Sequence, residues 1–470
     1  MDFARTTAFM ARIWDEEIIP TLTDYIRIPN KSPAFDPDWE AHGYMEQAVG
    51  MFAAWAENKL RQFPGASLEV VRLKGRTPLI FIEIPGNVPG TVLMYGHLDK
   101  QPEMLGWDAD KGPWQPLIQD GKLYGRGGAD DGYAMFASLA ALLALKDQGI
   151  AHARTVIVIE ACEESGSPDL PFYIDHLAAR IGEPDLVVCL DSGCGNYEQL
   201  WLTTSLRGNL IGNLTVRVLT EGMHSGAASG IVPSSFRILR ALLSRIEDEA
   251  SGRMKLPELF ADIPQDRQTQ AREAARILGD EVWSGVPFAG KTKPMAEGNA
   301  ELILEKTWRP QLAVTGMDGY PLPANGGNVL LPYSTAKLSL RLPPTLEAEK
   351  ARAALKMALE KDPPYDAEVE FDVPRGDDGW NAPTLAPWLE ASLNKASLAA
   401  FGKPVAFQGE GGSIPFMAML GRSFPKTQFV VTGVLGPHSN AHGPNEFLHI
   451  AFARKLSAAI AQLLADYANQ

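Results

Sequence analysis

Five short segments of the sequence concentrate acidic and histidine residues where strand-like or helical patterns meet loops. They are 95–99 (Tyr-Gly-His-Leu-Asp), 125–132 (Gly-Arg-Gly-Gly-Ala-Asp-Asp-Gly), 160–167 (Glu-Ala-Cys-Glu-Glu-Ser-Gly-Ser), 190–193 (Leu-Asp-Ser-Gly) and 438–446 (His-Ser-Asn-Ala-His-Gly-Pro-Asn-Glu). Four of them follow an apolar, β-branched run, and the second leads into a helical pattern. Ligands of open α/β sheets gather beyond the carboxyl ends of the strands, so we expect these segments to converge.

A cluster of imidazole and carboxylate groups suits two divalent cations. Such ligands fit Zn²⁺, with Mn²⁺ and Co²⁺ as alternatives. A shared carboxylate can hold two ions about 3.5–4 Å apart and bring the pKa of a water between them near neutrality. A neighbouring carboxylate that binds no metal can then act as general base. The sequence offers surplus acids for that role, because Asp99 lies close to His97 and Glu163 adjoins Glu164.

Taken singly, each of these residues also has a purely structural interpretation. A lone His97 is more often packed or hydrogen-bonded than a ligand, and Asp130 could be a turn or helix-capping residue. Glu163 and Glu164 could be a solvated pair, and His442 a surface residue. Five such segments at equivalent places favour a metal cluster over five coincidences.

The apolar runs that precede the segments predict buried strands. They cover residues 68–73, 79–84, 91–95, 155–159, 186–190 and 429–434. Near-continuous apolar runs of this length are typical of strands covered on both faces. Helical patterns at 133–146 and 447–467 accompany them. This alternation predicts an α/β fold, with a mostly parallel sheet and helices on both of its faces.

The middle of the chain has a different pattern. Residues 213–219, 335–342 and 367–373 alternate apolar and polar side chains, with helical patterns at 234–249 and 346–361. Alternation of this kind indicates a sheet with one solvated face. We therefore predict a catalytic domain formed by 1–206 and 379–470, and a smaller inserted α+β domain, 207–378. Within it, 251–306 reads as a loop-and-helix insertion.

Composition narrows the function classes. The 470-residue chain has a net charge of −14, which argues against nucleic acid and anionic membrane partners. Its three cysteines have no paired spacing, so buried thiols are favoured over metal ligands or disulfides. The N-terminal segment lacks the apolar stretch of a signal peptide, and no apolar run reaches the roughly 18 residues of a membrane span. We expect a cytoplasmic enzyme.

From about Leu93 to Glu446 the chain resembles the M20 metallopeptidases, most closely the branch of the cytosolic non-specific dipeptidases and carnosinases. The resemblance lies in the segments described above and in an ordered series of further motifs. These are Met-His-Ser-Gly at 223–226, Arg-Pro at 309–310, Leu-Arg-Leu at 340–342 and Glu-Gly-Gly-Ser-Ile-Pro at 410–415. The series is specific, although each motif alone is weak.

The resemblance implies a role for each matching residue. It implies five metal ligands: His97 and Asp191 for one cation, Glu164 and His442 for the other, and Asp130 as the bridge. Glu163 is implied as the general base and Asp99 as the residue that orients His97. A cis peptide bond between Asp130 and Asp131 is also implied.

The implied substrate contacts lie in the inserted domain and in the late Gly-rich turn. Arg341, Gly412 and Ser413 would hold a free carboxylate of the substrate, with Asn328 as a further contact. His224 would steady the oxyanion in the active site of a neighbouring subunit, which implies a homodimer. A lid and dimerisation role for the inserted domain is likewise implied by the family resemblance.

Two departures from the family pattern stand out. Gly132 and Tyr133 follow the Asp-Asp pair where the family usually has Lys-Gly, which affects the local turn but removes no ligand. His438 is an additional histidine four residues before His442, and either could be argued as the ligand, although the surroundings of His442 match the family better.

The expected function is metal-dependent hydrolysis of the amide bond of dipeptides or other short peptides. The alternative on the same metal site is an N-acyl-amino-acid deacylase or a carboxypeptidase. A non-catalytic binding protein with this fold would be expected to lack a ligand or the base, and none is missing from the sequence.

Overall fold

The computed structural model describes residues 1–374 and 376–470, which form two compact units. The first unit consists of Met1–Thr204, Ala382–Gln408 and Met419–Gln470, and the second of Ser205–Asn381 and Gly409–Ala418. The divisions near Ser205 and Asn381 lie close to the predicted domain boundaries. The chain passes between the units within β8 (Trp201–Leu206), after β16 (Trp380–Asn381), within β17 (Ala406–Glu410) and within α14 (Pro415–Ser423).

A six-stranded sheet organises the first unit. Its order is β1 (Ser67–Val71), β2 (Leu79–Ile84), β6 (Ala153–Glu160), β3 (Val88–His97), β7 (Leu186–Cys189) and β18 (Gln428–Val431). The last four strands run parallel, whereas β1 and β2 join antiparallel. The predicted α/β class with a mostly parallel sheet is therefore confirmed. The exception is β1, which lies at the sheet edge with exposed Ser67 and Glu69 instead of being buried on both faces.

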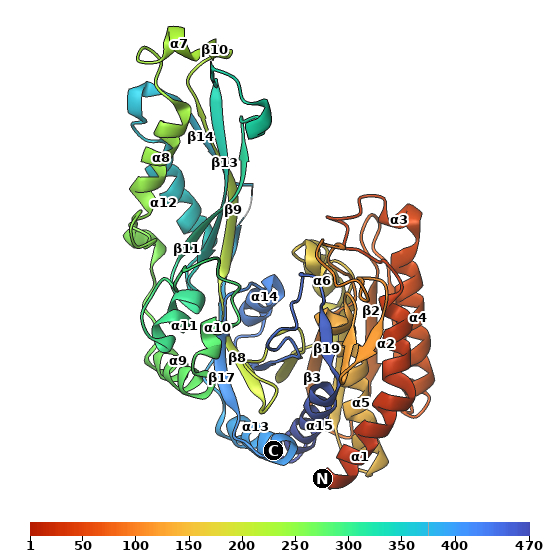
Figure 1. Cartoon of the computed structure of the whole chain (residues 1–470). Coiled ribbons are helices and arrows are strands. Elements are labelled where there is room, and N and C mark those ends of the chain that lie inside the picture. The colour runs from red at the N-terminus through yellow and green to blue at the C-terminus, as the bar shows by residue number, and fades with distance from the viewer. Residues whose placement is uncertain (375) are drawn as a thin grey trace. The chain divides into compact units, whose positions relative to one another are not determined.

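Helices cover this sheet. Those of the first unit are α1 (Phe3–Ile13), α2 (Ile19–Ile26), α3 (Trp39–His42), α4 (Tyr44–Leu60), α5 (Ala134–Asp147), α6 (Leu170–Ile181), α13 (Pro387–Phe401) and α15 (Ile450–Tyr467) (Figure 1). Every side chain of α5 from Ala134 to Leu145 is buried, as expected of a helix that is apolar all round. The connections β3–α5–β6 and β6–α6–β7 run in opposite directions along the sheet, so right-handed crossovers place α5 and α6 on opposite faces.

A small antiparallel sheet joins two distant parts of the first unit. Its strands are β4 (Leu117–Gln119), β5 (Lys122–Tyr124) and β19 (Phe447–His449). Phe447 pairs with Tyr124, and the Gly125 amide donates to the Glu446 carbonyl over 3.0 Å. The segments that follow β5 and precede β19 therefore lie side by side.

The second unit is an antiparallel sheet with helices on one face. The strand order is β11 (Gln311–Asp318), β13 (Tyr333–Leu342), β9 (Gly208–Arg217) and β14 (Glu368–Asp372), with β15 (Gly376–Asp377) also paired to β9. Burial alternates along β9 and β13, as the sequence pattern predicts. Helices α8 (Ser235–Ile246) and α12 (Ala348–Glu360) pack on the buried side, where they share an apolar core with the strands (Figure 1).

The remaining elements of the second unit include three helices in the predicted insertion and a short strand pair with its helix. Helices α9 (Gln265–Leu278), α10 (Glu281–Ser284) and α11 (Asn299–Thr307) lie in the predicted insertion, and α7 (Ser225–Ala228) follows β10 (Met223–His224), which pairs with β12 (Val329–Leu330). Among the described residues, no helix combines the length and apolar character needed to cross a membrane. Cys162, Cys189 and Cys194 are buried and form no disulfide.

We expect Gly132→Ala to destabilise the protein, because an added methyl at this position has no room. Its Cβ would lie 2.6 Å from the Gly127 carbonyl oxygen and would overlap the ring of Tyr25 in α2. Overpacking of this kind costs about 1–3 kcal/mol. The control is Gly50→Ala in α4, where a Cβ meets nothing within 4 Å and helix propensity favours alanine by roughly 0.5–1 kcal/mol. Urea unfolding midpoints should move in opposite directions, and a neutral Gly132→Ala would contradict the expectation.

Candidate metal centre

The parallel sheet positions most of the acids predicted for the site. His97 ends β3, Asp191 lies two residues after β7, and Glu163 and Glu164 form the turn that follows β6. These three strands are neighbours, with β3 between the other two, and the chain reverses its direction along the sheet at β3. The site therefore lies at a topological switch point, where open α/β sheets bind their ligands.

The small sheet positions the other two candidate ligands. Asp130 lies in the irregular turn Gly128–Gly132 that follows β5, and His442 lies in the loop before β19. Because β5 and β19 pair, both residues reach the same place although more than 300 positions separate them. The Asp130–Asp131 peptide bond is cis, as the family resemblance implies.

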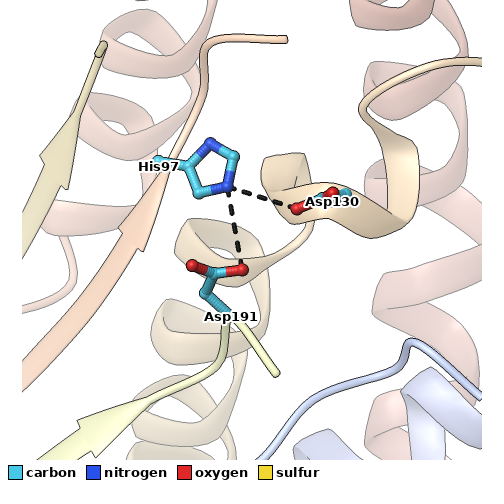
Figure 2. A group of neighbouring side chains, drawn as sticks. All are labelled: His97, Asp130 and Asp191. Atoms are coloured by element: carbon cyan, nitrogen blue, oxygen red, sulfur yellow. Dashed lines mark ion pairs between the residues drawn. The ribbon is translucent and has the colours of Figure 1, made fainter. Parts of the chain in front are cut away.

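The first group of potential metal ligands consists of His97, Asp130 and Asp191 (Figure 2). The Nε2 atom of His97 lies 3.3 Å from Oδ1 of Asp130 and 3.7 Å from Oδ1 of Asp191. All three side chains are buried.

The second group consists of Asp130, Glu164 and His442. The Nε2 atom of His442 lies 3.0 Å from Oδ2 of Asp130 and 3.3 Å from Oε2 of Glu164. Asp130 thus turns one carboxylate oxygen to each group. Within each group, one ligand atom per residue lies within 4.8 Å of the others.

The electrostatics of the cluster are those of a site that lacks positive charge. Burial raises the pKa of Glu163, Glu164, Asp131 and Asp191, and repulsion between the acids adds to this shift. Burial opposes ionisation of Asp130 as well, but the neighbouring imidazoles of His442 and His97 hold its pKa below the usual range.

Two buried atoms of the candidate ligands have no hydrogen-bond partner in the part of the chain that the structure describes. They are Nε2 of His97 and Oε1 of Glu164. Buried polar atoms are rarely left unpaired in native proteins, so these atoms fit metal ligation. The donor set of imidazole nitrogens and carboxylate oxygens also suits divalent transition metals.

Asp99 connects the two sides of the cluster. His97 Nδ1 lies 3.2 Å from the Asp99 carbonyl oxygen and 3.5 Å from its carboxylate. That carboxylate also accepts the backbone N–H groups of Glu163 (3.1 Å) and Glu164 (3.0 Å). Asp99 therefore fixes the turn of Glu163 and Glu164 in addition to contacting the imidazole of His97. The contact with the imidazole was predicted, whereas the contact with the turn was not.

Glu163 lies beside the candidate ligands and belongs to neither group. Its Oε2 is 4.0 Å from His97 Nε2, and its side chain is largely buried. Like Asp99 and Asp131, Glu163 is thus a carboxylate next to the cluster that lies outside both ligand sets, and it is the one that faces Nε2 of His97. His438 also belongs to neither group, and its side chain is exposed.

Three further residues contact the cluster without having been assigned a role from the sequence. Gln101 donates to Oε2 of Glu164 over 2.6 Å, and Asp131 accepts the backbone N–H of His97 over 3.2 Å. Arg126 pairs with Glu446 beside His442. Arg126, Asp131 and Glu446 lie in the motifs that carry the family resemblance. Their presence in these motifs was the sequence signal that could have identified them as residues of the site.

The candidate substrate residues lie in two separate clusters of the second unit. Arg341 donates to Ser413 Oγ over 3.2 Å, and this hydroxyl donates to the Arg207 carbonyl over 2.6 Å. The Gly412 carbonyl accepts the Arg207 N–H over 3.1 Å. Arg207 is buried, and burial together with the charge of Arg341 lowers its pKa to about 10. Two guanidinium groups thus lie at one Gly-rich turn, and neither pairs with a carboxylate among the residues described.

The second cluster of candidate substrate residues lies at the short β10–β12 strand pair. His224 lies opposite Val329, and the Ser225 N–H donates to the Asn328 carbonyl over 2.8 Å. The side chains of His224 and Asn328 are both exposed.

Comparisons with known proteins identify the family and the fold of the chain. A family model described as peptidase family M20/M25/M40 matches residues 93–466. The cysteinylglycine-S-conjugate dipeptidase of Corynebacterium striatum is 26% identical over 419 residues, covering 85% of this chain and 88% of the relative. The beta-Ala-His dipeptidase of Mus musculus is 27% identical over 369 residues, or 73% and 71% of the two chains. The solved structure of the dipeptidase Dug1p from Saccharomyces cerevisiae superimposes with a TM-score of 0.78 at 21% identity, covering 100% of this chain and 99% of that one.

We expect divalent cations to stabilise the folded protein, because they would offset the repulsion among the buried acids. A ligand present at about 100 times its Kd stabilises the fold by roughly 2.7 kcal/mol per site. Zn²⁺ added to chelator-treated protein should therefore raise the Tm, and Asp130→Ala should abolish most of the rise. Asp175→Ala, an exposed aspartate on α6, is the matched control. An unchanged Tm in the unsubstituted protein would contradict cation binding here.

Proposed function

The chain belongs to peptidase family M20/M25/M40, and from this premise we propose that it is a metallopeptidase that hydrolyses the amide bond of dipeptides. Named dipeptidases are among the relatives that match over most of the chain. The observation that carries the proposal is the position of Asp130, whose two oxygens each face a separate group of imidazole and carboxylate ligands.

We propose that His97 and Asp191 hold one divalent cation, that Glu164 and His442 hold the other, and that Asp130 binds both. Zn²⁺ is the proposed ion, because two imidazoles and three carboxylates match its ligand preference. When bound, such ions polarise a carbonyl group and lower the pKa of water toward neutrality.

Glu163 is proposed as the general base. Of the carboxylates beside the cluster that belong to neither ligand group, Glu163 faces Nε2 of His97, whereas Asp99 faces Nδ1 and Asp131 accepts the backbone N–H. A base in this position takes a proton from the attacking water and delivers it to the leaving amine. Asp99 assists by holding the backbone of the Glu163 turn and by facing Nδ1 of His97, which keeps Nε2 directed at Asp130 and Asp191.

Arg341, Gly412 and Ser413 are proposed to bind the substrate's free carboxylate. The guanidinium of Arg341 makes a single hydrogen bond, to Ser413, which leaves donors for a bidentate contact. The nearby charge of Arg207 adds to the attraction for an anion. Such an anchor favours short substrates, because a carboxylate must lie close to the scissile bond.

We propose a homodimer in which His224 steadies the oxyanion in the partner's active site, with Asn328 as a further substrate contact. The support is that His224 is exposed and lies beside the exposed apolar side chains of Met223 and Val329. A cytoplasmic location stays a prediction, with which the absence of disulfides among the described cysteines is consistent.

Glu163→Gln should abolish most of the activity while the metals stay bound. Loss of a general base typically costs about 10²–10⁴-fold in rate. Hydrolysis is measured on a panel of dipeptides, tripeptides and N-acyl amino acids with defined added metals, before and after chelation. Glu57→Gln, an exposed glutamate on α4, is the control and should keep full activity.

The same experiment separates the possible outcomes. Activity that survives chelation would exclude the metal mechanism, and full activity of metal-loaded Glu163→Gln would exclude this base. Cleavage of N-acyl amino acids in preference to dipeptides would identify the deacylase alternative. If subunits exchange, mixing Glu163→Gln with His224→Ala should restore part of the activity, and complete failure to do so would count against a shared site.

Arg341→Met should weaken dipeptide binding without a comparable effect on peptides that lack a free carboxylate. A charge-assisted hydrogen bond contributes about 1.5–3 kcal/mol, which corresponds to a KM increase of roughly 10- to 100-fold. Comparing each dipeptide with its C-terminal amide gives the readout, because the variant should lose the preference for the free acid. Arg217→Met, an exposed arginine on the same sheet, is the control. An unchanged preference in Arg341→Met would rule out the proposed clamp.

A further inference from the structure

The two ligand groups are held in place by different means. His97 and Asp191 lie at the ends of β3 and β7, which pair directly in the parallel sheet. His442 has no such support, since it lies in a loop with a half-exposed side chain, 56% accessible. Its backbone φ is positive, as are those of Asn440 and Asn445, so the loop adopts a conformation that side chains other than glycine disfavour.

Arg126 and Glu446 form an ion pair at the base of this loop. Their side chains are 1% and 0% exposed, and Nη1 of Arg126 donates to Oε2 of Glu446 over 2.5 Å. The other carboxylate oxygen of Glu446 accepts the Gly127 N–H over 2.9 Å. Neither residue belongs to a ligand group, and neither has a part in the proposed reaction.

The remaining donors of Arg126 reach the loop of His442 and the chain that follows β3. Its Nη2 donates to the carbonyl oxygens of His442 (3.1 Å) and Gly443 (2.8 Å). Its Nε donates to the carbonyl of Pro102 over 3.3 Å, and the preceding residue, Gln101, is the one that donates to Glu164.

The backbone of the pair also leads to Asp130. Arg126 and Gly127 directly precede the turn Gly128–Gly132, and Glu446 binds that chain at the Gly127 N–H. The guanidinium is therefore bound to the His442 loop and adjoins the Asp130 turn along the chain, and it reaches Glu164 only through Gln101. Among the described residues it donates to neither His97 nor Asp191, although Pro102 lies in the segment that follows His97.

We propose that the buried Arg126–Glu446 pair is the positioning device of the second cation site, that of Asp130, Glu164 and His442, and that the first site depends on it only through the shared Asp130. This inference rests on the proposed two-cation function. A single planar group with five donors can bind four acceptors in fixed directions, which the compact ammonium of lysine cannot do.

The test is calorimetric titration of Zn²⁺ into chelator-stripped protein, with the bound metal counted after desalting. The unsubstituted chain should bind two ions. In Arg126→Lys and in Glu446→Gln, binding of one ion should weaken about 10- to 100-fold, the usual effect of losing a partner that orients metal ligands, while the affinity for the other ion, which shares only Asp130 with it, falls much less. Circular dichroism and the retained first ion show that the variants are folded.

Arg72→Lys is the matched control. Arg72 makes a bidentate pair with Glu46, at 3.1 and 2.6 Å, but both side chains are about half exposed and lie away from the ligand groups. Its substitution should leave both affinities unchanged. His442→Ala serves as the reference for loss of the second site, and adding Arg126→Lys to it should have little further effect on metal binding, because the two changes remove the same site.

The outcomes distinguish the inference from the function on which it rests. Two ions bound with unchanged affinity by Arg126→Lys and Glu446→Gln would overturn the inference alone. Equal weakening of both ions would overturn it too, because that would indicate a general effect on the fold. Fewer than two ions bound by the unsubstituted chain would overturn the proposed function as well. Selective loss of one ion in the single variants, with no additional loss in the double variant, would establish the inference that the Arg126–Glu446 pair positions the second site.

Discussion

Buried carboxylates repel one another, and the rest of the first unit must hold several of them together. Asp130, Asp131, Glu163, Glu164 and Asp191 are gathered within one region, with two imidazoles among them. Burial alone makes such an arrangement unfavourable unless positive charge compensates it. The sheet ends, the Asp99 contacts and the Arg126–Glu446 pair can be understood as the parts of the structure that impose it.

These parts differ in kind. Parallel strands fix the places of His97 and Asp191 through backbone pairing, which depends little on the side chains of the site itself. Loops supply Asp130 and His442, and here side chains take over the positioning, through the short β5–β19 pairing and the buried guanidinium of Arg126. The centre therefore combines a scaffold common to α/β sheets with a local network particular to this arrangement.

The sequence sufficed to predict what depends on local patterns. The β2 strand has its predicted bounds, 79–84, and the acids that follow β3, β6 and β7 do meet, because strand ends in one sheet share an edge. Long-range pairing left little local signal. The three-residue strand β19 lies where the sequence predicts the start of the last helix, so its pairing with β5, which brings His442 next to Asp130, left no local signal beyond the expected convergence of the five segments. The contacts of Arg126 depend on the same pairing and could not be foreseen, since a buried arginine resembles any other arginine in a sequence.

The sharing of Asp130 between the two ligand groups has a thermodynamic consequence. Because one carboxylate faces both ligand groups, whatever fixes its orientation on one side fixes it on the other. The two cation-binding equilibria are then coupled, and linkage requires that each ion change the affinity for the other by the same factor. Loss of either ion would therefore weaken the binding of the other by that factor, without making the two binding events a single one.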